Sequence, residues 1–424
     1  MKIAFIVSKF PCLSETFILN QITGLIDRGH EVDIIAEGGD NISKIQSEVE
    51  KYNLIDRTYY IGKPENIFYR ILKIFPLIFT KFIRHPIILF KSLNIIRYRS
   101  KAYSLALFYA AANLLDKKLD YDIIHCHFGP NGVRGIIFKE IGLFQAKIIT
   151  TFHGYDVNQY PRRFGKDIYN KLFEEGDLYT INSRFTGEKA ISLGCPKEKI
   201  IRHPVGLELS DFYFQKREVN PNQLIKIITV GRLVEKKGIE YSIRAFAKVL
   251  DRYNNLEYQI IGDGILRAEI ETLIAELGVS NKVKLLGFKT HDELQQLYAD
   301  AHIFILSSVT SADGDKEGQG LVLQEAQAMG LPVLSTLHNG IPDGVLDGES
   351  GFLVPERDVD ALAEKLNYLI EHPELWSEMG KAGRAFVEEN FNIDKLNDRL
   401  VEIFQSLLHP ETDSKTALKT LVKT

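Results

Sequence analysis

Short, continuous apolar runs alternate with helix-like segments along the whole chain of 424 residues, and this alternation constrains the fold more than any other feature. In the first half, helices are expected between most of the strands, for example at 15–27 and 184–193. The strands of this half are expected at residues 3–7, 32–35, 123–126, 147–151 and 178–181. Such runs are typical of parallel strands that helices cover on both faces.

The second half repeats this pattern. Its strands are expected at residues 226–230, 258–261, 284–286, 303–306 and 332–335. Its helices are expected near residues 238–250, 268–277, 292–299 and 322–329. The sequence therefore predicts an α/β protein with two doubly wound, Rossmann-like domains that face each other across a cleft. Ligands of such domains bind beyond the carboxyl ends of the strands.

The expected borders follow the changes in composition. Residues 1–205 form the first domain, and the polar stretch 206–223 links it to a second domain at 224–395. A C-terminal helix is expected at 396–410, and the polar tail 411–424 is expected to be flexible.

Composition excludes several classes of protein. Hydrophobic residues make up 45% and charged residues 25%, so the chain is neither disordered nor fibrous. The three cysteines show no paired spacing, which indicates a reducing compartment. The N-terminal apolar run is followed by no small-residue cleavage site, and no apolar stretch is long enough for a transmembrane helix. We therefore expect a cytoplasmic protein.

The net charge of −4 conceals an uneven distribution. Residues 1–205 carry 29 Lys and Arg against 21 Asp and Glu, whereas the remainder carries 23 against 35. Much of the basic excess lies in 63–101, where Glu65 is the one acidic residue. The basic residues of this segment are Lys63, Arg70, Lys73, Lys81, Arg84, Lys91, Arg97, Arg99 and Lys101.

Aromatic and aliphatic residues lie between these basic residues, and Pro76 and Pro86 are expected to divide the segment into short helices. The apolar residues include Phe68, Tyr69, Phe75, Phe79, Phe82, Ile87, Leu89 and Phe90. This combination suits the inner surface of an anionic membrane, where each basic residue contributes about 1 kcal/mol. The alternative is an ordinary helical insertion packed on the first domain. Nucleic acid is not expected as a partner, because the rest of the chain is acidic and carries no recognition motif.

Two motifs follow strands of the second half. Gly231 and Arg232 come directly after the strand at 226–230, and Lys237 follows five residues later. Guanidinium and ammonium groups at a strand end can hold a diphosphate, although two surface cations would be the simpler explanation of this motif alone.

The second motif starts at Glu317 and ends at Glu325, with glycines at 318 and 320. Glycines at a helix N-terminus leave backbone N–H groups free for an anion. One carboxylate can then face a sugar while the other accepts hydrogen bonds from a ribose diol. Asp313 and Asp315 have the spacing of a metal-binding pair, but they lie in a polar loop, and we expect no metal there.

Together these motifs resemble the nucleotide-sugar-binding domain of the retaining glycosyltransferases of family four, which have the GT-B fold. The family pattern EGFGLVLLEAMACGLPV corresponds here to EGQGLVLQEAQAMGLPV, and GRLVEKKG matches the upstream phosphate-binding motif. Matches at 260–264 and 338–354 extend the resemblance over about 226–390. The element FPxxSETF near the N-terminus resembles the subgroup that builds bacterial exopolysaccharides such as colanic acid.

The resemblance implies roles for individual residues. Arg232 and Lys237 would stabilise the donor diphosphate, Glu325 would bind the ribose hydroxyls, and Glu317 would hold the transferred sugar. The residues that would also bind the donor are Gly231, Gly262, Gly318, Gln319, Gly320 and Leu321. Gln319 departs from the family pattern, which has an aromatic or apolar residue there, so the sugar stays open.

The first half matches the family less densely. By resemblance, His153 would contact the donor sugar near the reacting carbon, and the expected catalytic residues are His153, Glu317, Arg232 and Lys237. Acceptor binding is expected at Ser14, Glu15, Thr16, His127 and Asp156, although Ser14 and Glu15 suit a helix cap equally well and Asp156 could instead orient His153. His125 and His127 share one face of a strand, but no third metal ligand is evident.

The resemblance implies a metal-independent hexosyltransferase with no cofactor, in which the anomeric configuration of the sugar is retained. Its partners would be a nucleotide-diphosphate sugar and a saccharide acceptor in lipid-linked form, at the inner face of the cytoplasmic membrane. Two alternatives stay open: another GT-B enzyme, such as a sugar phosphorylase or nucleotide-sugar epimerase, and a non-catalytic nucleotide-sugar-binding protein. The sequence predicts no oligomeric state.

Overall fold

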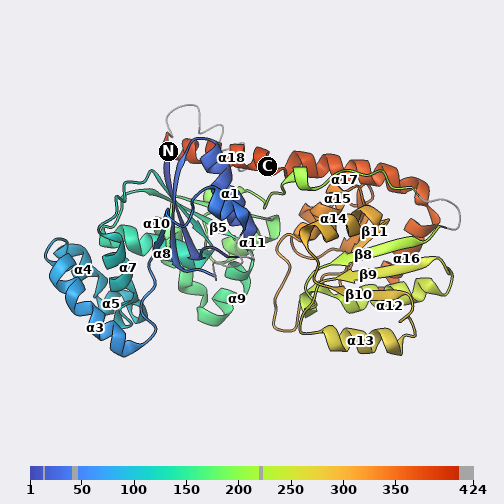
Figure 1. Ribbon diagram of the computed structural model, residues 1–424, viewed down its shortest axis with the longest axis horizontal. Helices are drawn as coiled ribbons and strands as arrows, with labels where there is room; N and C mark the ends of the chain where they lie inside the picture. The colour runs from blue at the N-terminus through green and yellow to red at the C-terminus, as the bar shows by residue number, and fades with distance from the viewer. Residues whose placement is uncertain (13–14, 41–45, 219–222, 410–424) are drawn as a thin grey trace.

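The computed structural model describes residues 1–12, 15–40, 46–218 and 223–409, and it contains two parallel sheets (Figure 1). The first is seven-stranded, with the order β3-β2-β1-β4-β5-β6-β7. Its strands are β1 (Lys2–Lys9), β2 (Glu31–Gly38), β3 (Thr58–Tyr60), β4 (Ile123–His127), β5 (Lys147–Phe152), β6 (Leu178–Ile181) and β7 (Ile200–Arg202). The predicted doubly wound arrangement of the first half is confirmed, since strand order reverses at β1 and every pairing is parallel.

Both faces of this sheet are covered, and the reason can be followed along β1. Ile3, Phe5 and Val7 face one side, while Ala4 and Ile6 face the other, and all five are buried. The helices of this half are α1 (Thr16–Asp27), α2 (Ser47–Lys51), α3 (Ile67–Leu77), α4 (Pro86–Ser92), α5 (Ile95–Tyr98), α6 (Ser100–Tyr103), α7 (Ala106–Leu114), α8 (Gly129–Ile141), α9 (Tyr155–Phe164), α10 (Asn170–Glu175) and α11 (Arg184–Ser192).

The second sheet is six-stranded and parallel, with the order β10-β9-β8-β11-β12-β13. Its strands are β8 (Ile225–Val230), β9 (Leu256–Ile261), β10 (Val283–Gly287), β11 (Ile303–Leu306), β12 (Val333–Thr336) and β13 (Gly351–Val354). Its helices are α12 (Ile239–Leu250), α13 (Arg267–Glu276), α14 (His291–Asp300), α15 (Leu321–Ala328), α16 (Val359–Glu371) and α17 (Trp376–Asn390). The second half is therefore also doubly wound, as predicted.

The chain passes between the two domains twice. After α17, the last helix α18 (Ile393–Leu408) returns to the first domain, as the red ribbon along the upper edge of Figure 1 shows. Leu400, Ile403 and Phe404 of α18 are fully buried in the core beside α1. At the crossing point, Leu207 N–H donates to the carbonyl of Phe391 at 2.7 Å. The two connections thus lie side by side.

The basic segment 63–101 forms short helices at one end of the first domain (Figure 1). Pro86 starts α4, whereas Pro76 lies inside α3, which continues into the π-helical turn Ile78–Phe82. Leu89 is fully buried and anchors the segment on the core. The side chains of Phe75 and Phe79 lie outside the described set. No helix in the described ranges is long and apolar enough to span a bilayer.

Candidate active site

Lys237 and Glu317 form a buried ion pair at the carboxyl edge of the second sheet. Lys237 ends the 3-10 turn Glu235–Lys237 that follows β8, and Glu317 lies in the loop between β11 and α15. Nζ of Lys237 is 2.6 Å from Oε2 of Glu317, and the two side chains are 11% and 15% exposed. Gly231 is adjacent, since a Cβ there would meet Cε of Lys237 at 3.4 Å. The two motifs of the second half therefore meet in one place.

The charge on Glu317 is stabilised by its neighbours. Burial alone would raise its pKa, but the positive charges of Lys237 and Lys236, together with the hydrogen bond from Lys237, lower that pKa to about 2. His338 holds the Glu317 backbone: its Nε2 accepts from Glu317 N–H at 3.0 Å, and its Nδ1 lies 2.6 Å from Oε1 of Glu356. Glu317 is thus ionised and fixed in position. The contact of His338 with Glu317 was not predicted, although His338 is the first residue of the family match at 338–354.

Arg232 follows Gly231 and is exposed. Its guanidinium forms no hydrogen bond or ion pair within the described part of the chain. Gly262 packs against the backbone of Gly231. Its φ is +127°, and a Cβ at this position would meet the Gly231 carbonyl oxygen at 2.1 Å. Only glycine fits such a close approach. Arg232 therefore stands on a tightly packed loop with its charge uncompensated.

Helix α15 begins directly after the glycines of the second motif. Gly320, at φ +78°, is its N-cap, and Leu321 is its first residue. Glu325 lies one turn further on, where it accepts a hydrogen bond from Tyr298 Oη at 2.9 Å. Burial raises the pKa of Glu325, against the opposing effects of that hydrogen bond and of the charges on His291 and Lys237. Tyr298 thus fixes the orientation of the Glu325 carboxylate, a partner that sequence alone did not indicate.

The side chain of Gln319 is directed to the connection between the two domains, and donor binding at Gln319 stays a prediction. Its Oε1 accepts from Val205 N–H at 2.8 Å, and its Nε2 donates to the Val205 carbonyl at 2.9 Å. The side chain is buried, 6% exposed. The side-chain amide of Gln319 therefore pairs with both backbone groups of Val205. This pairing explains why an amide stands where the family has an apolar residue.

Loops of the two domains touch at Gly318 and His153. A Cβ at Gly318 would meet the His153 carbonyl oxygen at 2.7 Å, and a Cβ at Gly154 would meet the Cα of Gly318 at 3.6 Å. Because His153 follows β5 and Gly318 follows β11, the carboxyl edges of the two sheets face each other. The structure thus brings His153 beside the motif that contains Glu317.

His153 and His127 form a stacked and hydrogen-bonded pair. His127 Nδ1 lies 3.0 Å from His153 Nε2, and the ring planes are inclined by 18°. Burial lowers the pKa of His153 to about 3, and burial together with the neighbouring histidines lowers the pKa of His127 well below its ordinary value. His127 Nε2 is buried without a hydrogen-bond partner in the described structure. Both rings are therefore neutral at physiological pH and can exchange only donor and acceptor roles.

His125 continues this row, since its ring centroid is 4.5 Å from that of His127, but its Nε2 pairs with Thr151 Oγ1 at 2.7 Å. Within the described ranges, no group of three or more His, Cys, Asp or Glu residues could hold a metal ion. Asp313 accepts from Ser311 and from the Asp315 backbone, while Asp315 pairs with Lys236 at 3.1 Å. These aspartates thus shape their own loop.

Asp156 orients the His153 loop in the structure, and its predicted role in acceptor binding stays a prediction. Its carboxylate is fully buried and accepts from the N–H groups of Gly129, His153 and Gly154 at 2.9–3.0 Å. Burial raises its pKa to about 6, although these hydrogen bonds oppose the rise. Asp156 therefore positions the His153 loop against the start of α8.

The predicted acceptor residues near the N-terminus lie at the start of α1. Thr16 is exposed, and Glu15 occupies the N-cap without a side-chain capping hydrogen bond. Ser14 lies outside the described residues. Burial, together with the charge of Asp40, raises the pKa of Glu15 against the effect of Lys9. This loop stands near the histidine pair, because the Phe17 ring lies 4.8 Å from that of His153.

A further contact between the domains was missed by sequence reasoning. Asp343, in the loop after β12, is 8% exposed and accepts from both the backbone N–H and Nε of Arg184, at 2.5 and 2.6 Å. Arg202 also donates to the Asp343 carbonyl at 3.1 Å. Arg184 begins α11, directly after Asn182 and Ser183 at the end of β6. Only the arrangement of the two domains shows that Arg184 is the partner.

Comparison with known proteins agrees with this architecture. Solved structures of Anabaena Alr3699/HepE, one with UDP and one with UDP and glucose, superpose with TM-scores of 0.72 and 0.68. Each covers 96% of this chain and 100% of the compared chain at 18% identity. The sucrose-phosphate synthase of Thermosynechococcus elongatus gives a TM-score of 0.68 at 20% identity, over 97% of this chain and 100% of that one. The GT-B fold is therefore confirmed.

Sequence relatives are nearer. The putative colanic acid biosynthesis glycosyltransferase WcaL of Salmonella typhimurium is 35% identical, and the amylovoran biosynthesis glycosyltransferase AmsK of Erwinia amylovora is 37% identical. Each comparison covers 96% of this chain and the whole of the relative. Residues 14–211 match Glycosyltransferase Family 4, and residues 211–386 match Glycosyl transferases group 1. The chain thus belongs to the family of the group 1 and family 4 glycosyltransferases and is a glycosyltransferase with the GT-B fold.

Proposed function

We propose that the protein transfers a hexosyl group from a nucleotide-diphosphate sugar to a saccharide acceptor in exopolysaccharide biosynthesis. The observation that carries this proposal is the Lys237–Glu317 pair, which stands beside Gly231 and beneath the His153 loop of the other domain. An ammonium and an ionised carboxylate so placed can meet the two parts of a donor, its diphosphate and its sugar. The relatives WcaL and AmsK, named for colanic acid and amylovoran, support the pathway class.

In this proposal, Arg232 and Lys237 bind the donor diphosphate and stabilise the negative charge that develops on it. Arg232 has no competing partner in the described structure. Lys237 has one, Glu317, and can exchange that contact for the diphosphate. Glu325, oriented by Tyr298, accepts hydrogen bonds from the ribose diol. HepE, which has the same fold, has been solved with UDP, and this supports a nucleoside diphosphate as the donor's leaving group.

The transfer itself proceeds with retention of the anomeric configuration. The bond between the anomeric carbon and the phosphate oxygen breaks, and the acceptor oxygen bonds to that carbon on the same face. The acceptor's proton passes to the leaving phosphate. Glu317 stays ionised, since its pKa lies near 2, so it holds sugar hydroxyls and orients Lys237 without donating a proton. No metal is required in this scheme, because the two cations take over charge stabilisation.

The acceptor is lipid-linked in this proposal, and the segment 63–101 contacts the inner membrane surface. Several large apolar side chains of the segment are strongly exposed, among them Phe90 at 74%, Ile87 at 69% and Ile96 at 94%. Three basic residues have partners within the protein: Lys81 pairs with Asp116, Arg97 pairs with Glu140, and Arg70 donates to backbone carbonyls. The others make no ion pair with described residues, and they are Lys63, Lys73, Arg84, Lys91, Arg99 and Lys101.

A panel of nucleotide sugars tests the donor assignment. The correct donor should raise the thermal unfolding temperature by mass action, and it should be consumed only when a saccharide acceptor is present. Proton NMR of the product then reads the anomeric configuration. Release of sugar 1-phosphate in the presence of phosphate, or interconversion of nucleotide sugars without an acceptor, would contradict the proposal.

A further inference from the structure

The hydrogen bond between His127 and His153 allows two arrangements of the ring protons. His127 ends β4 and is fully buried, whereas His153 follows β5 and is half-buried. A neutral imidazole carries one N–H, and His127 Nδ1 lies 3.0 Å from His153 Nε2. If His127 Nδ1 donates, His127 Nε2 is a lone pair and His153 carries its proton on Nδ1. If His153 Nε2 donates, His127 carries its proton on Nε2 and His153 Nδ1 is a lone pair.

The surroundings of His127 Nε2 favour the first arrangement. This nitrogen is buried and has no hydrogen-bond partner among the described residues. Aromatic rings enclose the imidazole: Phe5 stacks on it with the ring centroids 5.6 Å apart and the planes inclined by 14°, and the Phe17 ring lies 6.1 Å away. In protein interiors, N–H groups without an acceptor are rarer than acceptors with an unused lone pair. His127 Nε2 is therefore the lone pair, and the ring proton is on Nδ1.

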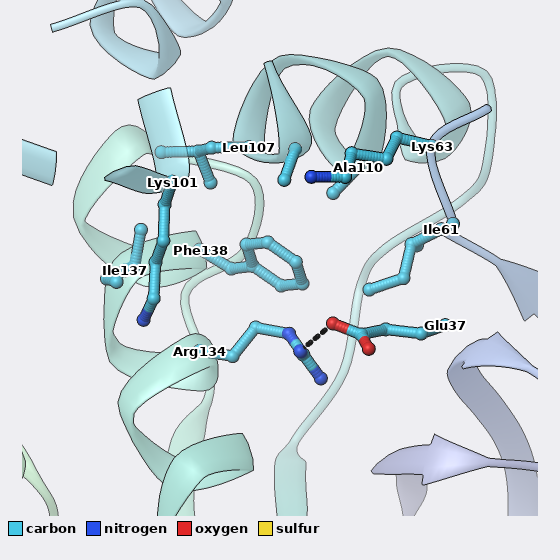
Figure 2. Close-up of a pocket in the computed structure, with 11 residues that line it drawn as sticks. Glu37, Ile61, Lys63, Lys101, Leu107, Ala110, Arg134, Ile137 and Phe138 are labelled. Carbon is cyan, nitrogen blue, oxygen red and sulfur yellow. Dashed lines mark hydrogen bonds and ion pairs between the residues drawn. The ribbon is translucent and has the colours of Figure 1, made fainter. Parts of the chain in front are cut away.

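Side chains of α8 hold the backbone of His127. Asn131 Nδ2 donates to the His127 carbonyl at 2.8 Å, and Arg134 Nη1 donates to Asn131 Oδ1 at 2.5 Å. Figure 2 shows Arg134 joined in turn to Glu37, across a cavity of about 420 Å³ in the first domain. The main chain of His127 is thus anchored, and its Nδ1 stays directed at His153 Nε2.

His153 lies beside the loop that carries Glu317. A Cβ at Gly318 would meet the His153 carbonyl oxygen at 2.7 Å, and Asn182 Nδ2 donates to the same oxygen at 3.3 Å. The backbone N–H of His153 donates to Asp156 at 3.0 Å. His153 Nδ1, in contrast, makes no hydrogen bond with any residue that the structure describes. It is the ring atom that is left to meet a substrate.

We propose that His127 is a positioning residue that fixes the tautomer of His153, so that His153 Nδ1–H donates a hydrogen bond to a substrate oxygen beside the Glu317 loop. Because Nε2 accepts from His127 and Nδ1 carries the proton, neither nitrogen of His153 has a free lone pair. His153 therefore orients a substrate oxygen and does not take up the acceptor's proton. This inference rests on the proposed glycosyl transfer, in which that proton passes to the leaving phosphate.

Long-range proton–nitrogen correlation spectra of the full chain, labelled with ¹⁵N-histidine, show which ring nitrogen carries a proton. The His153 signals are assigned by their absence from the spectrum of His153→Asn. At pH 7 we expect His153 to carry its proton on Nδ1 and to have an unprotonated Nε2. A protonated Nε2 on His153, or a mixture of both tautomers, would overturn the inference.

Variants of His127 separate a positioning role from a structural one. His127→Asn places an amide N–H near the position of Nδ1 and should keep the tautomer of His153, whereas His127→Leu has no donor and should give a mixture. His125→Gln is the matched control, because His125 is equally buried in β4 but bonds to Thr151, so this change should leave the His153 tautomer as it is. An unchanged tautomer in His127→Leu would show that His127 does not fix it. If His127→Leu does not fold, the wild-type spectrum still decides the tautomer.

Transfer rates, measured with the nucleotide sugar of the panel that is consumed, test the donor role of His153. His153→Asn keeps an N–H near the position of Nδ1 but cannot take up a proton, so kcat should fall by less than about tenfold, whereas His153→Leu should lower kcat about a hundredfold. Equal losses of about a hundredfold in both variants would mean that His153 takes up the proton, and the inference would fall while glycosyl transfer stands. Absence of transfer with every nucleotide sugar would instead count against the proposed function, and the wild-type spectrum would still report the tautomer.

Discussion

The side-chain amide of Gln319 and the backbone of Val205 are joined by two hydrogen bonds, at 2.8 and 2.9 Å, in the manner of neighbouring β-strands. Gln319 belongs to the loop that carries Glu317 and Gly318, and Val205 lies at the connection between the domains. Two residues further on, Leu207 pairs with Phe391 and Ile393 of the second connection. The loop that carries Glu317 is therefore hydrogen-bonded to the connection between the two domains.

Gln319→Ala should lower the free energy of unfolding by about 1–3 kcal/mol, because it leaves two polar backbone groups without their partners. The measurement is chemical denaturation at pH 7. Gln296→Ala is a suitable control, since Gln296 lies exposed on α14 and pairs only with Asp300 at 3.1 Å, and its effect should stay within about 0.5 kcal/mol. Equal stability of the wild type and Gln319→Ala would show that the pairing contributes nothing.

Lys237→Ala should slow transfer by raising its activation free energy by about 2–4 kcal/mol, because it removes a charge that acts on the leaving diphosphate. Steady-state kinetics with saturating acceptor measure this loss. Lys236→Ala is the matched control, since it also removes one positive charge but leaves the 2.6 Å pair of Lys237 and Glu317 in place. A similar loss in both variants would argue for a general electrostatic effect.

Lys237→Ala should also reduce the free energy of unfolding, by on the order of 3 kcal/mol, because it leaves the Glu317 carboxylate buried without a counter-charge. Adding Glu317→Gln should restore part of this loss, since the amide carries no charge to be compensated. A double-mutant cycle over the two single variants and their combination measures the coupling. Strict additivity of the two losses would contradict the ion pair as described.

Acidification should destabilise the first domain through its buried histidines. His203, 3% exposed, follows β7 and pairs through Nε2 with the Leu396 carbonyl of α18 at 2.9 Å. Burial lowers its pKa to about 4, so below pH 6.5 the unfolded chain takes up a proton that the folded chain does not. The resulting loss is about 2 kcal/mol at pH 5 for this one side chain.

His203→Gln tests this, because glutamine can keep a donor to Leu396 but does not titrate. The variant should lose less stability than the wild type between pH 7 and pH 5 in urea unfolding. Asp156 acts with the opposite sign: its raised pKa of about 6 means that the cost of burying its charge disappears as the pH falls. Asp156 is present in both proteins, so their difference isolates His203. Identical pH profiles would contradict the assignment.

Ile87→Ser combined with Phe90→Ser should weaken binding to vesicles that contain anionic lipid, since the two side chains are 69% and 74% exposed and carry much of the apolar face. Co-sedimentation measures this. Arg84→Glu with Lys91→Glu should have the same effect and should add a dependence on salt. Leu89→Ser is unsuitable, because Leu89 is part of the core. Unchanged sedimentation of both double variants would exclude this surface.

The central strands of both sheets could be predicted from sequence, whereas short edge strands could not. β3, β7 and β13 were missed; they are three or four residues long and pair on one side only. A central strand such as β11 is buried along its whole length and shows a continuous apolar run, IFIL. An edge strand needs less burial, so its sequence carries a weaker signal.

Residue types predicted the site better than residue roles. Lys237 and Glu317 lie together because each follows a strand that ends at the carboxyl edge of the second sheet, and His153 follows a strand that ends at the facing edge of the first. The roles of Gln319 and Asp156 depended on backbone groups that the fold brings to them; for Gln319, these belong to a residue 114 positions away. Phe17 was also overlooked as a neighbour of His153, because ring contacts of this kind depend on how α1 is placed.

The return of α18 to the first domain has a consequence for synthesis of the protein. Leu400, Ile403 and Phe404 complete a core that includes residues of β1, β2 and α1. A nascent chain that has emerged only as far as residue 205 therefore exposes part of that core to solvent. The first domain is translated before the second, yet its core is completed only after residues 400–404 have left the ribosome.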